Sequence, residues 1–364
     1  MKKLISVLLA ALMLLSVAAF AEGDYRVAMI TDYGDITDQS FNQTTYEACK
    51  AFCEANGIDF TYYKPNGDST AERVAMVEKA DDEGYNVIVM PGYAFGETIA
   101  EVQEEYPEIS FIALDVSEGD LGGATVAENV YCAVYKEELC GYMAGYAAVK
   151  LGYTHLGYLG GMAVPAVVRY GFGFVQGANA AAEELGITDK VTVEYVYGNQ
   201  FFGDADITAY MDNWYQTLGV QVVFACGGGI YSSAAEAAAK VDGGKVIGVD
   251  VDQAAIIDGT YGAGLTVTSA MKGLGATVNM LLAETIAGNF SNYGGKVEAL
   301  GLVGTDPAAN YVQLAPSTQF SDGFTEADYN DLVAKMFNGE ITVSDAIDAM
   351  PATTITVNDL GTVK

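Results

Sequence analysis

The feature that most constrains the fold is a regular alternation of short apolar strands with helical segments. In the first half of the chain, the predicted strands cover residues 25–31, 60–63, 86–90 and 110–115, with helical patterns between them. Most of these strands are continuous apolar runs rather than apolar and polar residues in turn, which is typical of strands buried on both faces. Strands that alternate with helices form parallel sheets, because a parallel pair needs a long crossover. The sequence therefore predicts an α/β fold with parallel sheets.

The same rhythm restarts after residue 151, so two α/β units of similar size are expected. The second set of predicted strands covers residues 155–159, 191–197, 220–225, 245–250 and 265–269. Between the two sets, residues 125–130 are read as a short edge strand and residues 136–150 as a long helix of small residues. The tail is expected to add a helix at residues 325–337 and a short extension. A chain of 364 residues is long enough for two domains, each with its own core.

The first residues have the pattern of a secretory signal peptide. Two lysines follow Met1, an apolar run spans residues 4–17, and Ala19-Phe20-Ala21 forms a small-residue cleavage site. The apolar run is too short for a membrane span. We therefore expect residues 1–21 to be removed after Ala21, leaving a secreted protein. Because no cysteine lies near this site, no lipid anchor is expected there.

Charge and composition exclude several classes of function. The chain has 48 acidic and 17 basic residues, a net charge of −31, which repels nucleic acids and anionic membranes. The single histidine, His155, disfavours histidine-based metal sites and a Ser-His-Asp triad. The five cysteines show no CxxC spacing, so a zinc ribbon or a redox motif is disfavoured and small buried residues are expected. No metal or cofactor is expected.

Chemically informative residues follow the predicted strands, where parallel sheets bind their ligands. They are Asp32, Phe41 and Asn42 after the first strand, Asp115 after the fourth, and Phe201, Phe202, Gly228 and Asp250 in the second unit. Two units that face each other would enclose a cleft of carboxylates, an amide, glycine backbone and aromatic rings, with few cations. That lining suits a neutral, polyhydroxylated ligand with a flat ring, and it does not suit a phosphate.

Each of these features also has a purely structural interpretation. Asp32 or Asp38 could cap the following helix, and Phe41 could be a core residue. The three glycines at 227–229 could form only a tight turn, since no phosphate-binding pattern surrounds them. Asp250 and Asp252 could cap the next segment, and His155 and Trp214 are read as structural. The argument for a site therefore rests on the joint placement of these residues at strand ends.

Residues 32–42 resemble the D-x-G-x-x-D-x-S-F-N signature of the basic membrane protein family, the PnrA-like, purine-nucleoside-binding components of ABC transporters. Further segments resemble family motifs in the same order along the chain. They are residues 107–115, 136–148, 156–161, 171–177, 197–204, 223–229, 246–253 and 269–272, the last of which contains Lys272. The resemblance covers about residues 25–290. The family's lipidated cysteine has no counterpart here.

The resemblance implies a role for each site residue. Phe41 would stack on one face of the purine and Phe201 or Phe202 on the other, because one extra residue in this loop leaves the choice open. Asp32 and Asn42 would lie at the base end, where Asp115 would bond purine ring nitrogens. Gly228 and Asp250 would hold ribose hydroxyls, with Lys272 nearby.

The resemblance also implies a type I periplasmic-binding-protein fold, with two Rossmann-like lobes joined by three crossovers. The first lobe is expected to comprise residues 22–151 plus about 265–292, and the second residues 152–264 plus about 293–320. Residues 321–364 would form a C-terminal helical extension.

The leading hypothesis is a secreted solute-binding protein, not an enzyme, that delivers nucleosides to an ABC permease and meets the membrane only through it. One alternative is a nucleoside-hydrolase-like enzyme, with Asp32, Asp35 and Asp38 as a calcium loop. A second alternative is a ligand-sensing surface protein with the same fold and no transporter.

Overall fold

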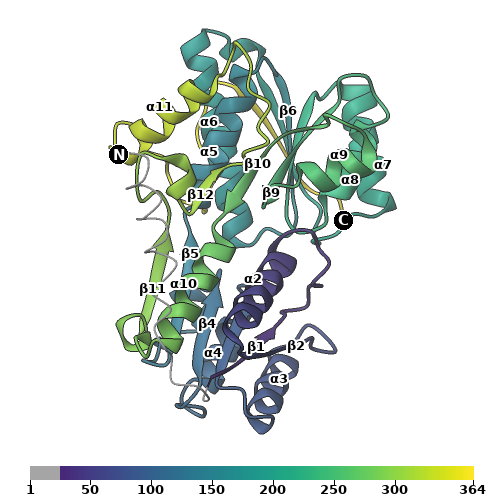
Figure 1. Ribbon diagram of the computed structural model, residues 1–364. Coiled ribbons are helices and arrows are strands. Elements are labelled where there is room, and N and C mark those ends of the chain that lie inside the picture. Colours follow the sequence, from purple (N-terminus) through teal and green to yellow (C-terminus); the bar gives the residue numbers. More distant parts are fainter. Residues whose placement is uncertain (1–24) are drawn as a thin grey trace, which may run out of the picture.

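The structure is a computed structural model that describes residues 25–364 as two lobes, each built on its own sheet (Figure 1). The predicted signal peptide, residues 1–21, lies outside the described residues. The first sheet has the order β11-β5-β4-β3-β1-β2, and all of its strand pairs are parallel. Its strands are β1 (Arg26–Ile30), β2 (Asp59–Tyr63), β3 (Val87–Pro91), β4 (Ser110–Leu114), β5 (Val130–Tyr135) and β11 (Lys296–Leu300).

The second sheet has the order β12-β10-β9-β8-β6-β7-β13. Its strands are β6 (His155–Gly160), β7 (Thr192–Tyr197), β8 (Val222–Cys226), β9 (Lys245–Asp250), β10 (Thr266–Lys272), β12 (Val312–Leu314) and β13 (Thr356–Thr362). The pairs are parallel except β12, which runs antiparallel to β10. Most of the central strands are buried along their whole length, as their continuous apolar runs predicted.

Helices cover the sheets and bury their apolar faces against them. The first lobe carries α2 (Phe41–Asn56), α3 (Thr70–Asp82), α4 (Phe95–Val102) and α10 (Leu274–Ile286). The second carries α5 (Glu137–Lys150), α6 (Pro165–Leu185), α7 (Ala205–Asn213), α8 (Tyr231–Ala238), α9 (Ala254–Tyr261) and α11 (Glu326–Phe337). The five cysteines are all free and buried, and Trp214 is a core residue, as expected.

The chain passes between the lobes three times, after β5, after β10 and after β11, which agrees with the predicted architecture. Backbone hydrogen bonds join the three connections to one another. The Lys136 amide donates to Leu300 O (2.9 Å), and the Gly273 amide donates to Tyr311 O (2.7 Å). The three connections therefore lie side by side and join the lobes as one hydrogen-bonded group.

Several predicted boundaries need correction. β10 belongs to the second sheet, whereas the sequence prediction places residues 265–292 in the first lobe; only α10, in the same range, packs on α2 of that lobe. β11 belongs to the first sheet, whereas the prediction places residues 293–320 in the second lobe. An apolar run shows that a strand exists but not which neighbour it pairs with, so the predicted positions of these two crossovers are wrong.

Two further corrections concern strands at the ends of segments. The expected edge strand at residues 125–130 is instead β5, which starts at Val130 and lies between β4 and β11. The tail is not only helical, because β13 follows α11 and extends the second sheet beside β7. Its sequence, with an Asp and a Gly among its residues, carries little strand propensity.

Candidate ligand-binding site

A cavity of about 550 Å³ lies between the lobes, at the carboxyl ends of both sheets' strands. Residues of both lobes line it, as expected for a ligand site in a parallel α/β fold. The residues predicted as a site all line this cavity: Asp32, Phe41, Asn42, Asp115, Phe201, Phe202, Gly228, Asp250 and Lys272. The expectation that residues after parallel strands share one edge therefore brought together residues as far apart in the sequence as Asp32 and Asp250, and Lys272, which only the family resemblance implied, joins them.

The first-lobe loop between β1 and α2 is shaped by its own acidic residues. Asp32 accepts the amides of Tyr33 and Gly34 (2.7 Å each), which folds the chain back after β1. Asp38 accepts the amides of Ser40, Asn42 and Gln43 (2.9–3.0 Å) at the start of α2. The capping interpretation is thus correct for Asp38 and wrong for Asp32, although both side chains also line the cavity.

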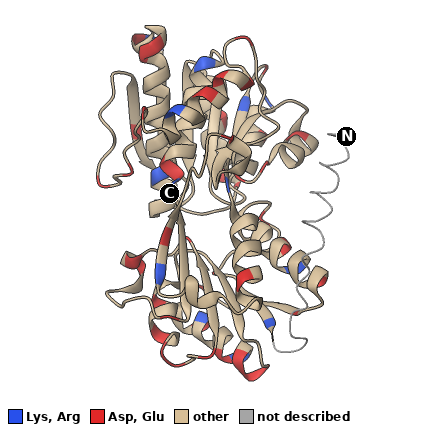
Figure 2. Ribbon diagram, turned by 60° about the vertical axis from the view of Figure 1, so that its left-hand side comes forward, with Lys and Arg blue, Asp and Glu red and all other residues tan. Residues whose placement is uncertain are grey.

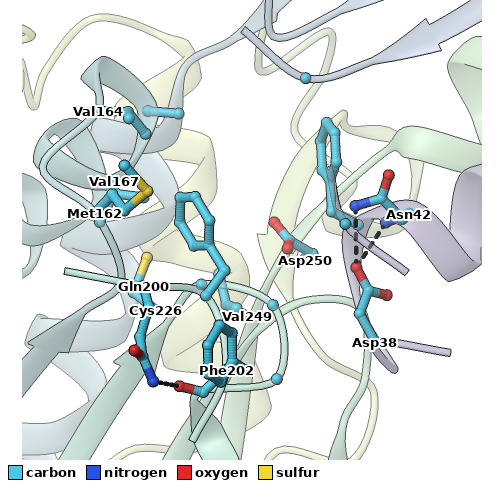
Figure 3. A pocket seen from close by; sticks show the side chains of 18 of the residues that line it. Asp38, Asn42, Met162, Val164, Val167, Gln200, Phe202, Cys226, Val249 and Asp250 are labelled. Atoms are coloured by element: carbon cyan, nitrogen blue, oxygen red, sulfur yellow. Dashed lines mark hydrogen bonds between the residues drawn. The ribbon is translucent and has the colours of Figure 1, made fainter. Parts of the chain in front are cut away.

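Asn42 is held by this loop and keeps one polar atom without a hydrogen-bond partner. Its amide nitrogen donates to Asp38 (3.3 Å), and its buried Oδ1 has no protein partner (Figure 3). A buried amide oxygen without a partner costs free energy, which a donor on a ligand can recover.

The aromatic loop between β7 and α7 presents Phe201 and Phe202 differently. Phe201 is half-buried, and its ring lies against Gly161 and Gly227, where a Cβ would come within 2.4 and 2.8 Å of the ring. Gly227 also has φ of +143°, which residues with side chains rarely adopt. Phe202 is 61% exposed at the rim. The glycines after β6 and β8 therefore make room for Phe201.

A buried charge network forms the floor of the cavity. Lys272, the last residue of β10, bonds Asp115 (2.5 Å) and lies 3.1 Å from a Glu137 carboxylate oxygen, and Arg169 pairs with the other Glu137 oxygen (2.6 Å). Burial opposes the charge of Lys272, but the carboxylates of Asp115, Glu137 and Asp250 outweigh it and raise the pKa of its amine. Its Nζ also lies 5.2 Å from the centre of the Phe41 ring.

Asp115 and Asp250 occupy matching places in the two lobes. Asp115 follows β4 and Asp250 ends β9, and both have left-handed backbones (φ of 60° and 65°). Such a conformation is uncommon outside glycine and clusters at functional sites. Asp115 keeps one buried oxygen, Oδ1, without a partner. Asp250 accepts a hydrogen bond from Ser40 Oγ across the cleft (2.6 Å).

Burial raises the pKa of both Asp32 and Asp250 to about 6. Backbone amides of Gly34 and Tyr33 oppose this shift at Asp32, whereas Lys272 and Ser40 oppose it at Asp250. The side chains are ionised at neutral pH and act as hydrogen-bond acceptors.

Sequence reasoning missed the apolar wall and part of the charge network. Figure 3 shows Met162, Val164 and Val167 facing Asn42 and Asp38 across the cavity. Tyr33, Tyr93, Tyr170 and Cys226 also line it, and Glu137 and Arg169 support Lys272. A signal exists for Met162 and Val164, which follow β6, but a search for polar and aromatic residues at strand ends passes over them.

Several further features of the described residues concern metal binding, His155 and the membrane. Within residues 25–364, no group of His, Cys, Asp and Glu side chains is arranged to hold a metal ion. Asp35, one member of the possible calcium loop, instead pairs with Lys64 (2.9 Å). His155 pairs with Glu194 (3.1 Å) and is not part of the cavity lining. None of the helices in the described range is both long and apolar enough to cross a bilayer.

Comparison with known proteins gives consistent results. A family model described as "ABC transporter substrate-binding protein PnrA-like" matches residues 25–345. The nucleoside-binding protein BmpA of a Lactococcus lactis ABC transporter is 26% identical over 285 residues, covering 73% of this chain and 76% of that protein. Basic membrane protein B of Borreliella burgdorferi is 28% identical over 283 residues, covering 76% and 78%.

Solved structures support the same fold. An ABC transporter solute-binding protein from Aeropyrum pernix K1 matches with a TM-score of 0.66 and 21% identity, covering 88% of this chain and 87% of that one. Another from Conexibacter woesei matches with a TM-score of 0.66 and 20% identity, covering 88% and 99%. The periplasmic-binding-protein fold predicted from the sequence is thus confirmed, and the chain belongs to the PnrA-like family of ABC transporter substrate-binding proteins.

Proposed function

We propose that this protein captures purine nucleosides in the interlobe cavity and delivers them to an ABC permease. The observation that carries the proposal is a pair of unpartnered acceptors, Asn42 Oδ1 and Asp115 Oδ1, in a cavity that also exposes the rings of Phe41 and Phe201. Acceptors without donors call for a ligand with N–H or O–H groups, and aromatic rings favour a flat heterocycle. A purine nucleoside supplies both.

The proposed roles follow the positions of the side chains. Phe41 and Phe201 stack on the base, and Phe201 rather than the exposed Phe202 provides the second face. Asp32, Asn42 and Asp115 accept hydrogens at the base end. Gly228 and Asp250 hold the ribose hydroxyls.

Electrostatics favours a neutral ligand over a nucleotide. Lys272 is the basic residue among those that line the cavity within the described chain, and carboxylates already neutralise it. A phosphate would enter a cavity that also holds Asp32, Asp38 and Asp250, where like charges repel it. Nucleosides should therefore bind, and their 5′-phosphates should bind much more weakly.

The proposal also includes a location for the mature protein. The signal-peptide pattern at residues 1–21 supports a mature protein outside the cytoplasm, where an ABC permease would receive its ligand. The relative from Lactococcus lactis is itself named a nucleoside-binding protein of an ABC transporter.

Isothermal titration calorimetry with inosine, hypoxanthine and ribose tests the function. Inosine should bind, and ribose should not, because the sugar lacks stacking worth roughly 1–3 kcal/mol per base. Ribose binding as tightly as inosine would overturn the assignment. Release of free base from inosine in the same sample would instead favour the hydrolase alternative.

Two variants test the orientation of the ligand. Asp115→Ala should weaken inosine and hypoxanthine alike, whereas Asp250→Ala should weaken inosine and leave hypoxanthine nearly unchanged. A hydrogen bond to a charged group contributes roughly 1.5–3 kcal/mol, so each loss should be about tenfold or more. Equal losses for both ligands in both variants would contradict this orientation, even if inosine binds the wild type.

A further inference from the structure

The chain after α11, residues 338–364, forms a strap along the second lobe. Its second part, residues 346–364, lies beyond the region matched by the family model. In Figure 1 this yellow segment ends close to the level where the two lobes meet. The strap therefore leads from the outer end of the second lobe toward the cavity.

Side-chain hydrogen bonds fix the first part of the strap to α6. Gln176 bonds both the amide and the carbonyl of Ser344 (2.9 and 3.0 Å). One turn further along the helix, Asn179 Oδ1 accepts the amide of Thr354 (2.8 Å). Ile355 then inserts into the core and is 5% exposed. These contacts set where the final strand begins.

β13 then covers the edge of β7 and runs parallel to it toward the cavity. The pairing begins at Thr356 opposite Thr192 and ends at Thr362 opposite Tyr197, and the Val363 amide donates to Tyr197 O (2.8 Å). Because Tyr197 is the last residue of β7, the strap is paired up to the point where the aromatic loop begins.

Lys364 contacts the aromatic loop itself, residues 198–204. Its amine binds the carboxylate of Asp204 and approaches Gln200 Oε1 (3.4 Å). Gln200, which lines the cavity, donates in turn to Asp204 (2.9 Å) and to the carbonyl of Phe202 (2.8 Å). The same Asp204 accepts the amides of Asp206 and Ile207 (3.0 Å each) at the start of α7. The C-terminal end of the strap, Lys364, therefore contacts residues on both sides of Phe201 and Phe202, namely Gln200 and Asp204.

We propose that the strap is a positioning element of the ligand site, with Lys364 and β13 holding the aromatic loop in its binding geometry before the ligand arrives. A preorganised loop loses less conformational freedom on binding, so affinity rises without any contact between strap and ligand. This inference rests on the proposed nucleoside function for its affinity readout, but not for its structural readout.

The experiment compares Lys364→Ala, Lys364→Arg, deletion of residues 356–364 and the control Lys335→Ala. Lys335 also forms an exposed ion pair, with Asp331 on α11 (2.7 Å), and neither residue lines the cavity. Hydrogen–deuterium exchange reports on the amides of the aromatic loop, where Gly198 and Asn199 bond Gly160 and Gly161. Calorimetry with inosine, at a temperature where every variant is folded, reports on affinity.

Lys364→Ala should speed exchange in residues 198–204 and weaken inosine binding about threefold, the size expected for a partly exposed ion pair. Lys364→Arg should restore both, and the deletion should weaken binding tenfold or more. Lys335→Ala should change neither. If the deletion prevents folding, Lys364→Ala and its Arg rescue still decide the question.

Unchanged exchange in residues 198–204 of Lys364→Ala, or faster exchange with unchanged affinity, would overturn the positioning role. Failure of wild-type protein to bind inosine would instead reject the proposed function. In that case the exchange comparison alone decides whether the strap holds the loop.

Discussion

At the residue scale, substitution of Phe41 can distinguish whether this residue binds the ligand or only packs in the core. Its half-buried ring lines the cavity and also packs against the main core cluster. Phe41→Ala should weaken inosine binding about tenfold to a hundredfold, since loss of one stacking face costs ~1.5–3 kcal/mol, while folding stays cooperative. Calorimetry and thermal melts measure the two effects, with Phe337→Ala on the exposed end of α11 as the control. A much lower Tm with unchanged affinity would identify Phe41 as a core residue.

The raised pKa values of Asp32 and Asp250 predict opposite pH effects on stability and binding. The folded-state pKa of each is about 6 and lies above the ordinary value of 3.8, so folding favours the protonated carboxyls. Their contribution to stability is fully present below pH 3.8 and is lost as the pH rises from there through about 6. Ligand hydroxyl and N–H groups need the ionised form, so affinity should rise over the same window.

Inosine should therefore bind about tenfold more weakly at pH 5 than at pH 7.5 for each carboxylate that must ionise, because one pH unit below the pKa leaves ~10% ionised. Calorimetry across pH 4.5–8 measures this, and Asp250→Asn should flatten part of the profile. A flat wild-type profile would show that neither carboxylate accepts a hydrogen bond from the ligand.

At the scale of elements, the close pairing of α5 and α6 supports the cavity floor. Gly141 and Gly145 on α5, and Gly173 and Gly177 on α6, each have a carbonyl of the other helix about 2.0–2.1 Å from where a Cβ would lie. The helices can approach this closely only with glycine at the contact. Glu137, the first residue of α5, and Arg169, near the start of α6, are thereby brought within 2.6 Å.

Gly145→Ala should therefore destabilise the protein by about 1–3 kcal/mol, the usual cost of overpacking, although alanine is the better helix former. The matched control is Gly259→Ala in α9, an exposed helical glycine with nothing within 4 Å, which should be neutral or slightly stabilising. Urea unfolding measures both changes. Equal stability of the two variants would mean that the helices can separate at no cost.

At the scale of the whole molecule, contacts across the cleft describe a closed arrangement of the lobes. Besides the bond from Ser40 to Asp250, Gln253 donates to Gln39 O (3.1 Å), and the rings of Tyr33 and Phe201 stack at 6.4 Å. Acidic positions occur along the ribbons of both lobes (Figure 2), so the net charge of −31 opposes closure through general repulsion. A ligand that contacts both lobes favours the closed state.

Small-angle scattering should show compaction when inosine is added to the wild type, and less compaction for Asp250→Ala at saturating ligand. Ser40→Ala, which removes one contact present only when the lobes meet, should weaken binding about tenfold. Ser317→Ala is the matched control, because Ser317 bonds Asp252 within the same lobe (2.6 Å). Compaction that is equal in wild type and Asp250→Ala would remove Asp250 from the closure mechanism.

Sequence patterns alone were enough to predict the α/β class, the two units and the residues that line the cavity between the lobes. Continuous apolar strands report burial on both faces, and residues after parallel strands share one edge, so strand order along the chain suffices to place Asp32, Asp115 and Asp250 in one cleft. The resemblance in residues 32–42 then pointed to the family, because that loop combines the turn, the helix cap and cavity-lining side chains.

The pairing of the strands and the contacts between distant side chains could not be predicted from the sequence and became known from the three-dimensional fold. The exchange of β10 and β11 between lobes, the strand at the tail and the different burial of Phe201 and Phe202 depend on crossovers and on glycines distant in sequence. Glu137 contacts Lys272 and Arg169 contacts Glu137 because α5 and α6 pack closely at their glycines. The sequence around Lys272 does not indicate these contacts. The local sequence pattern indicates whether a segment is buried. The segments that bury it come from distant parts of the chain, so the local pattern does not identify them.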